Sequence, residues 1–152
     1  MAERGVGTAA VSRRDVEAAA DRIAGWVRHT PLERQATLSR LCGEEIYVKL
    51  ENLQKTGSFK IRGALNKLLT LSEAERRRGV IAASAGNHAQ GVAYAALRTN
   101  SRAVIVMPRG AAVSKIAATK EYGAEVVLAG ETYDDAEAHA RALAAERGLT
   151  FV

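Results

Sequence analysis

The chain has 152 residues, 47% of them hydrophobic, which is enough for an α/β unit with a sizeable core. Its net charge of +5 is spread among 22 basic and 17 acidic residues, and the tight basic cluster at residues 76–78 has no interleaved aromatic side chains, so we expect no nucleic-acid partner. The single cysteine excludes an internal disulfide. No apolar run approaches the about 20 residues of a membrane span, and no apolar leader segment is present, so we expect a cytoplasmic protein without a membrane partner.

The first fifty residues predict short elements separated by turns. Ser12 followed by Asp15 matches a capping box at a helix start. Behind it the apolar residues Val16, Ile23 and Val27 recur at helical spacing, and we expect them to be exposed because no large domain covers them. The elements expected here are a loose tail over residues 1–12, a helix from there to about Gly25, a turn at residues 29–32 into a short helix that ends at Cys42–Gly43, and a strand over residues 46–50.

A lysine lies where the next turn enters an amphipathic helix. Ser58 is the expected helix cap, and Lys60 falls in the first helical turn. Because a helix N-terminus carries a partial positive charge, it disfavours an ammonium group and favours the neutral, nucleophilic amine. Lys60 is therefore a candidate for covalent chemistry, although most lysines are solvated surface groups. The helix is expected to end near Leu71, and a second capping box at Ser72 starts a helix that ends at Gly79.

From Val80 onward, short apolar strands alternate with amphipathic helices, which is typical of βαβ units over a parallel sheet. A capping box at Thr132 and glycines after two of the helices support the expected boundaries. The expected strands cover residues 80–83, 103–107, 125–128 and 149–152, and the expected helices cover residues 88–97, 114–122 and 132–147.

The segment Ser84–His88 follows a predicted strand and precedes a predicted helix, which is where open parallel sheets bind ligands. Backbone N–H groups at a helix start bind anions, and the small residues Ala85 and Gly86 let a ligand approach the backbone, so a substrate carboxylate fits there. The alternative is an ordinary turn in which Asn87 caps the helix. The other two histidines lack metal-ligand spacing, and we expect no metal site.

Two stretches together closely resemble one enzyme family. They are Val48–Ala64, which contains the octapeptide GSFKIRGA, and Ser84–Gly91, which has the sequence SAGNHAQG. From about Thr30 to its end, the chain is similar to the pyridoxal-phosphate-dependent threonine/serine dehydratases. The resemblance implies an α/β fold of the tryptophan-synthase-β-like class (pyridoxal-phosphate fold type II), with a parallel sheet flanked by helices and incomplete at the C-terminus. It assigns residues 1–71 to the N-terminal part of the large cofactor-binding domain and residues 78–152 to a small α/β domain with a four-stranded parallel sheet.

The resemblance also implies the chemistry. Pyridoxal 5'-phosphate would form a Schiff base with Lys60, beside Phe59, and Asn87 would hydrogen-bond its phenolic oxygen. The implied reaction converts L-threonine, and also L-serine, to 2-oxobutanoate or pyruvate and ammonia. His88 is expected to have a local hydrogen-bonding role and not to act as a general base. The residues expected to hold the substrate carboxylate are Ser84, Ala85, Gly86, Asn87 and His88.

Some parts of the family pattern are not among the 152 residues. The family binds the cofactor phosphate in a glycine-rich loop further along the chain and sets a serine, threonine or cysteine beside the pyridine nitrogen later still. We therefore expect an N-terminal fragment that is inactive alone, taken from a whole protein that forms a homo-oligomer. Some relatives bind a nucleotide effector, and the corresponding positions in this chain are Lys55, Thr56, Gln90 and Tyr122.

Other functions stay open at this point. Serine racemases and β-replacement synthases share the fold, and a non-catalytic βαβ module would show the same alternation. Racemases that resemble this chain commonly have a second serine in the loop, at the position of Ala85. Because a methyl group has no proton to give, the sequence favours elimination over racemisation.

Overall fold

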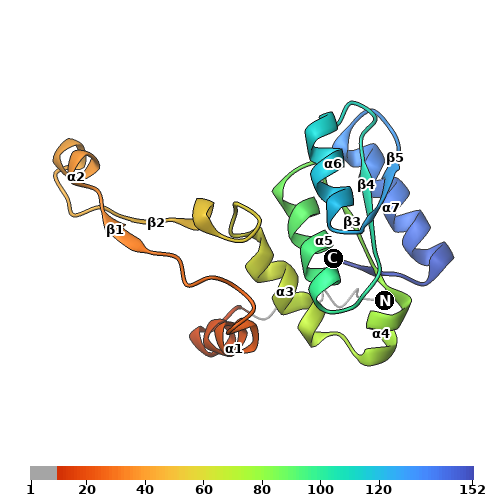
Figure 1. Cartoon of the computed structure of the whole chain (residues 1–152), viewed down its shortest axis with the longest axis horizontal. Helices are drawn as coiled ribbons and strands as arrows, with labels where there is room; N and C mark the ends of the chain where they lie inside the picture. The colour runs from red at the N-terminus through yellow and green to blue at the C-terminus, as the bar shows by residue number, and fades with distance from the viewer. Residues whose placement is uncertain (1–9) are drawn as a thin grey trace, which may run out of the picture.

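The first half of the chain forms an arm and the helices that join it to the body (Figure 1). The structure is a computed structural model that describes residues 10–152, so most of the expected tail lies outside the described residues. The arm, residues 32–49, is a two-stranded antiparallel sheet with a helix between its strands. The elements in this half are α1 (Arg13–Ile23), β1 (Leu32–Arg34), α2 (Ala36–Cys42), β2 (Tyr47–Lys49), the 3-10 helix η1 (Glu51–Leu53), α3 (Lys60–Thr70) and α4 (Glu73–Arg78).

The body is built on a parallel sheet of four strands, in the order β5-β4-β3-β6. The predicted four-stranded parallel sheet is therefore confirmed. The strands β3, β4 and β5 have their predicted bounds, whereas β6 is shorter than expected. The elements in this half are β3 (Val80–Ala83), α5 (Asn87–Arg98), β4 (Ala103–Met107), α6 (Val113–Glu121), β5 (Glu125–Leu128), α7 (Tyr133–Arg147) and β6 (Thr150–Phe151).

Both faces of the sheet are covered by helices, which explains why its central strands are continuously apolar. Side chains alternate between the two faces along a strand. Val80 and Ala82 on β3 belong to a core cluster with α3 and α5, whereas Ile81 and Ala83 belong to a second cluster with α7. The division of the chain into two domains near residues 71–78 stays a prediction.

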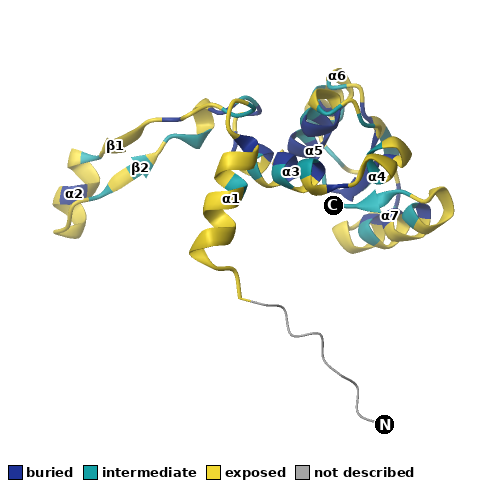
Figure 2. Ribbon diagram, turned by 90° about the horizontal axis from the view of Figure 1, so that it is seen from below, coloured by how far each residue is buried: buried dark blue, intermediate teal, exposed yellow. Residues whose placement is uncertain are grey.

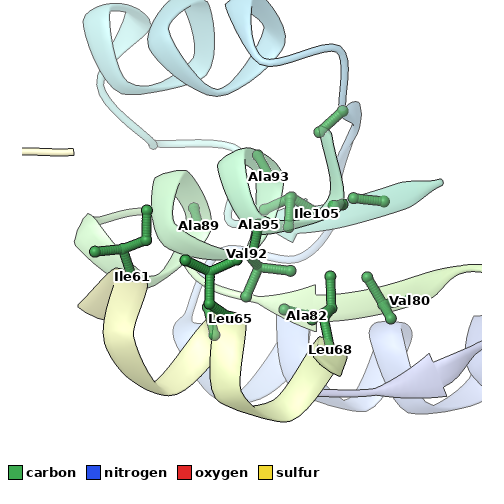
Figure 3. Packing of buried hydrophobic residues seen from close by; sticks show 14 of the residues in the cluster. Ile61, Leu65, Leu68, Val80, Ala82, Ala89, Val92, Ala93, Ala95 and Ile105 are labelled. Atoms are coloured by element: carbon green, nitrogen blue, oxygen red, sulfur yellow. The ribbon is translucent and has the colours of Figure 1, made fainter. Parts of the chain in front are cut away.

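Helix α3 packs directly on α5, and both helices cover the same face of the sheet (Figure 3). Ile61, Leu65 and Leu68 recur at helical spacing on α3 and are all fully buried. On α5, Val92 is fully buried against them. Fully burying such side chains contributes about 1.5–3 kcal/mol each. This contact therefore holds the start of α3, where Lys60 lies, against the sheet.

The arm is mostly exposed (Figure 2) and contains a strand that the sequence analysis missed. Residues 29–32 were expected to form a turn into a helix, but β1 starts at Leu32 and pairs with β2. Because β1 is only three residues long and none of its residues is buried, it has no apolar periodicity to detect. The expected strand over residues 46–50 is present as β2, and α2 ends at Cys42–Gly43, as predicted. Gly43 has a left-handed conformation.

Two local predictions are wrong, and one alternative is excluded. Ser58 does not cap α3, because Phe59 is the N-cap residue and the Ser58 hydroxyl is buried without a hydrogen-bond partner in the described chain. The alternative in which Asn87 caps the helix is excluded, because Asn87 is the first residue of α5 and Gly86 is the N-cap residue. Ile23 is buried rather than exposed, because α1 packs on α3 and seats this side chain in the main core cluster. Of the two other apolar residues that were expected to be exposed, Val16 on α1 is exposed, whereas Val27, which follows α1, is partly buried.

The capping boxes of α1, α4 and α7 are confirmed at Ser12, Ser72 and Thr132. In each box the serine or threonine hydroxyl accepts a hydrogen bond from the backbone of the third helical residue, whose carboxylate accepts one in return. No helix in the described part of the chain is long and apolar enough to cross a bilayer.

An ion pair locks the segment before α3 to the chain around Thr30. Arg62 donates from Nε and Nη2 to the two carboxylate oxygens of Glu51, at 2.9 and 2.7 Å. The Thr30 hydroxyl donates to the same carboxylate at 2.5 Å, and Gln54 exchanges two hydrogen bonds with the backbone of Arg28. The Glu51 side chain is only 16% exposed, so solvent screens this pair weakly. The turn that leads into Lys60 is thereby held in place.

The Glu51 pair makes stability depend on pH in a defined direction. Hydrogen bonding from Arg62 lowers the pKa of Glu51 below its ordinary value of 4.5. The native protein therefore keeps the carboxylate ionised where the unfolded chain protonates it, so the stabilisation is complete above about pH 4.5 and is lost as pH falls through the native pKa. At neutral pH, we expect Glu51→Gln to lower the free energy of unfolding by about 1–3 kcal/mol, with the difference from wild type shrinking below about pH 4.5.

Urea unfolding followed by circular dichroism at several pH values measures this difference. Glu45→Gln is the matched control, because the Glu45–Arg34 pair is exposed and contributes at most about 1 kcal/mol. A Glu51→Gln penalty that stayed constant down to pH 3 would contradict the assigned linkage.

Candidate active site

Lys60 lies between two pockets. It is the first residue of α3, as predicted, and its exposed side chain places Nζ 5.0 Å from the centroid of the Phe59 ring. It lines a pocket of about 430 Å³ on one side and a pocket of about 540 Å³ on the other. His88 is the other residue that lines both. The amine therefore has access to two adjoining spaces.

The larger of these two pockets lies at the carboxyl edge of the sheet, beside β3. Its lining includes Ser84, Asn87 and His88 from the predicted loop, together with Lys60. From β3 the chain runs outward to β4 and β5 on one side, while β6 pairs with β3 on the other. Strand β3 therefore borders the point at which the strand order reverses, and ligands bind at such points in open α/β sheets. The pocket, which is also lined by Ala83 and Tyr133, has the position expected of a ligand site.

The Ser84 side chain organises the loop. Its hydroxyl accepts hydrogen bonds from the backbone N–H groups of Gly86 and Ala89, both at 3.2 Å. Among the described residues, none accepts from the backbone N–H of Asn87 or His88. A side chain added at Gly86 would meet nothing within 4 Å, so the backbone borders open space there. Unpaired N–H groups at a helix start, with open space before them, can bind an anion.

His88 links this loop to the end of β6. Its Nε2 donates to the backbone oxygen of Val152 at 3.3 Å. The donated proton leaves that nitrogen unable to accept one, so this contact favours the local hydrogen-bonding role expected for His88.

The second pocket has mainly apolar walls and lies between α3 and the end of β6. Phe59, Ala64 and Phe151 provide apolar surface, and Lys67 adds a second ammonium group. Arg141 lies over the Phe151 ring at 4.3 Å from its centroid, on the wall from β6. The pocket therefore suits a ligand with a flat apolar part and a negative charge.

Tyr133 is a pocket residue that the sequence analysis missed. It is the first residue of α7, at the carboxyl edge of the sheet, and it lines the same pocket as Lys60. Glu137 accepts a hydrogen bond from its hydroxyl, which raises the pKa of the phenol. A tyrosine at a helix start does not by itself indicate a binding site. Only the arrangement of the strands and helices shows that α7 begins beside Lys60.

The four residues expected to bind a nucleotide do not line either Lys60 pocket. The Lys55 amine donates to the backbone oxygen of Trp26 at 2.7 Å, and the Thr56 hydroxyl is buried without a partner among the described residues. The Tyr122 ring packs edge-to-face on Tyr94, at 5.4 Å between centroids. Nucleotide binding at Lys55, Thr56, Gln90 and Tyr122 stays a prediction.

Similarity to known proteins agrees with this geometry. L-threonine ammonia-lyase of Thermotoga maritima is 51% identical over 142 residues, which cover 93% of this chain and 35% of that protein. L-threo-3-hydroxyaspartate ammonia-lyase of Pseudomonas sp is 47% identical, over 93% of this chain and 44% of that protein. Serine racemase from Dictyostelium discoideum superposes with a TM-score of 0.86 at 36% identity, over 93% of this chain and 46% of that one.

The chain thus spans less than half the length of each of these three relatives. Residues 23–152 match the family model described as pyridoxal-phosphate dependent enzyme, and both core clusters and both Lys60 pockets lie within that range. The chain therefore belongs to the family of pyridoxal-phosphate-dependent enzymes.

Proposed function

We propose that the whole protein is a pyridoxal-phosphate-dependent lyase that removes water from L-threonine, and from L-serine, to give a 2-oxo acid and ammonia. The observation that carries this proposal is that the Lys60 amine shares one pocket with the N-terminal loop of α5. A nucleophilic amine and an anion-binding helix start are the two groups that an α-amino acid substrate and an aldehyde cofactor require.

The residues around Lys60 fit the family's cofactor. The primary amine of Lys60 is the group that reacts with its aldehyde, and the Asn87 amide, in the same pocket, is suited to hydrogen-bond its phenolic oxygen. Phe59 and Ala64 offer apolar surface for its ring. When bound, pyridoxal phosphate supplies an electron sink that makes the Cα–H bond of the amino acid acidic.

The chain's own residues orient the substrate and move the protons. We assign the substrate carboxylate to the free N–H groups of Asn87 and His88, in the loop that Ser84 holds. Lys60 Nζ takes the Cα proton, the Cβ–O bond breaks, and the hydroxyl leaves as water after it gains a proton. The resulting enamine tautomerises and takes up one water molecule, which releases the 2-oxo acid and ammonia. The sum of these steps is one amino acid converted to one 2-oxo acid and one ammonia.

A β-hydroxy amino acid is the substrate class that the relatives favour. One relative is an L-threonine ammonia-lyase and another acts on L-threo-3-hydroxyaspartate, and both substrates have a hydroxyl on Cβ. We choose threonine because the threonine enzyme is the more similar of these two, at 51% against 47% identity. We also propose that the whole protein is a cytoplasmic homo-oligomer that binds neither membranes nor nucleic acids.

The alternative activity is racemisation, since a serine racemase has the same fold at 36% identity. Racemisation needs a proton donor on the face of the substrate opposite Lys60. Ala85 stands in the loop between Ser84 and Gly86 and packs against the core cluster, and its methyl group donates no proton. Elimination is therefore favoured over racemisation. A non-catalytic module is disfavoured because it has no need for the shared lysine pocket.

We expect Lys60→Ala to abolish the covalent bond between the protein and its cofactor. Lys60 is the lysine that borders both pockets, and alanine has no amine to react with the aldehyde. Borohydride reduction of the whole protein with pyridoxal phosphate, followed by peptide mass spectrometry, detects the adduct. Lys120→Ala, at an exposed position on α6, is the control and should retain it. A reducible lysine adduct that persisted in Lys60→Ala at the yield of the wild-type Lys60 adduct, above the background at exposed lysines such as Lys120, would sink the proposal.

We expect Ala85→Ser to increase racemisation at the expense of elimination. The new hydroxyl is a proton donor, and general acid–base catalysis by a positioned group contributes about 10²–10⁴-fold. Chiral chromatography of L-serine incubated with each whole enzyme gives the ratio of D-serine to pyruvate, which should rise at least about tenfold in the variant. Wild-type enzyme that made D-serine faster than pyruvate would overturn the choice of a lyase.

A further inference from the structure

Gly91 on α5 lies directly against the backbone of Lys60. It is buried, and a Cβ built at this position would lie 3.2 Å from the carbonyl carbon of Lys60 and 3.3 Å from the backbone nitrogen of Ile61. The same Cβ would lie 3.3 Å from Cβ of Lys60. These distances are shorter than the 3.4–4 Å of ordinary van der Waals contacts. The absent side chain therefore lets α5 approach α3 at the residue that carries the amine.

The surrounding packing fixes this approach. Ile61 and Leu65 on α3 and Val92 on α5 are fully buried and point into the space between the two helices and the sheet (Figure 3). Ala95, one turn after Gly91, is also fully buried. Packed interiors have few voids, so α3 and α5 cannot separate without opening this cluster. A methyl group at position 91 would instead displace the backbone at Lys60 by a few tenths of an ångström.

The position of Gly91 along α5 connects this contact to the pocket. Asn87 and His88 lie four and three residues before it, so they are on the neighbouring turn of the same helix. Lys60 is the first residue of α3, so the two helices bring their N-terminal ends together at this contact. The separation of the helices at Gly91 therefore sets how far the Lys60 amine lies from the loop that faces it.

We propose that Gly91 is a positioning residue, whose missing side chain sets the distance between the Lys60 amine and the Asn87–His88 end of α5. This inference rests on the proposed function, because it concerns the amine that bonds the cofactor. It concerns a residue that lines neither Lys60 pocket and touches no ligand there. Gly91 therefore acts through Lys60 and not on the substrate.

The size of the effect follows from the displacement. A misplacement of about 1 Å at a reacting group costs roughly 10²-fold, so a few tenths of an ångström should cost about three- to tenfold. We expect Gly91→Ala in the whole apo-protein to form the Lys60 adduct with pyridoxal phosphate about three- to tenfold more slowly. In the same protein the adduct at Lys120, an exposed lysine on α6, should be unchanged.

Pulsed borohydride trapping followed by peptide mass spectrometry measures both lysines in one sample. Yields are normalised to the folded fraction from circular dichroism, so that partial unfolding does not imitate the effect. Gly110→Ala is the matched control, because a Cβ there meets nothing within 4 Å, and it should trap at the wild-type rate. Ala140→Val controls for overpacking alone, because Ala140 is fully buried in the α7 cluster on the other face of the sheet.

Three outcomes separate the possibilities. A slowed adduct at Lys60 in Gly91→Ala, with wild-type trapping in both controls, supports the positioning role. Wild-type trapping in Gly91→Ala overturns it, as does an equal slowing in Ala140→Val, because the effect then follows general stability. If the wild-type protein forms no adduct at Lys60, the proposed function fails, and the inference fails with it.

Discussion

The contact between α3 and α5 is the interaction on which the site depends. It brings together the amine of Lys60 and the start of α5 at Asn87, which are 27 positions apart in the sequence. In the proposed function the ligand occupies the chemical groups of both segments, so neither segment can position the other through hydrogen bonds across the pocket. The apolar faces of Ile61, Leu65 and Val92 provide the alignment instead. In the proposed function, the alignment of the site therefore depends on burial of apolar surface, which is non-directional, and the close approach of the two helices at Gly91 would make it specific.

The polar network around Glu51 complements this apolar contact. Apolar packing holds the body of α3 against α5, but it does not fix the turn that precedes the helix. Glu51 and Arg62 join that turn to the helix two residues beyond Lys60, and Gln54 and Thr30 extend the network to the segment after α1. The backbone is thus held in place both before and after Lys60. A residue whose own side chain must move during a reaction benefits from a backbone that does not.

The sequence predicted the parallel sheet well because its strands are buried on both faces and bounded by clear helix signals. The runs Val80–Ala83 and Ala103–Met107 are wholly apolar, and the capping box at Thr132 marks a helix start without tertiary help. Their positions at helix starts made Lys60 and the Ser84–His88 loop candidates, but only the resemblance to the dehydratases assigned roles to them, and those roles stay predictions. Strand β1 was missed because its three residues are all exposed, and Ser58 was misassigned because a hydroxyl before a helix caps it only when its backbone allows.

Tyr133 and Gly91 show what sequence reasoning lacks. Tyr133 joins the pocket because α7, which follows β5, packs across β4 and β3, and local sequence patterns do not show which strands a helix covers. Gly91 matters because another helix crosses at that point, whereas the sequence offers only a glycine inside a helix.

The charges at the pockets give the last constraint on the ligand. The linings of the two Lys60 pockets contain the ammonium groups of Lys60 and Lys67 and, in the described part of the chain, no acidic side chain. The start of α5 adds a partial positive charge at the same place. The acidic group that contacts the pocket residue Tyr133, Glu137, accepts a hydrogen bond from it and pairs with Arg141, so its charge is already compensated. A site of this kind binds anions, and an amino acid carboxylate and a phosphorylated cofactor are both anions. For the proposed function, this charge distribution disfavours an amino acid with a cationic side chain relative to one whose side chain is neutral or acidic.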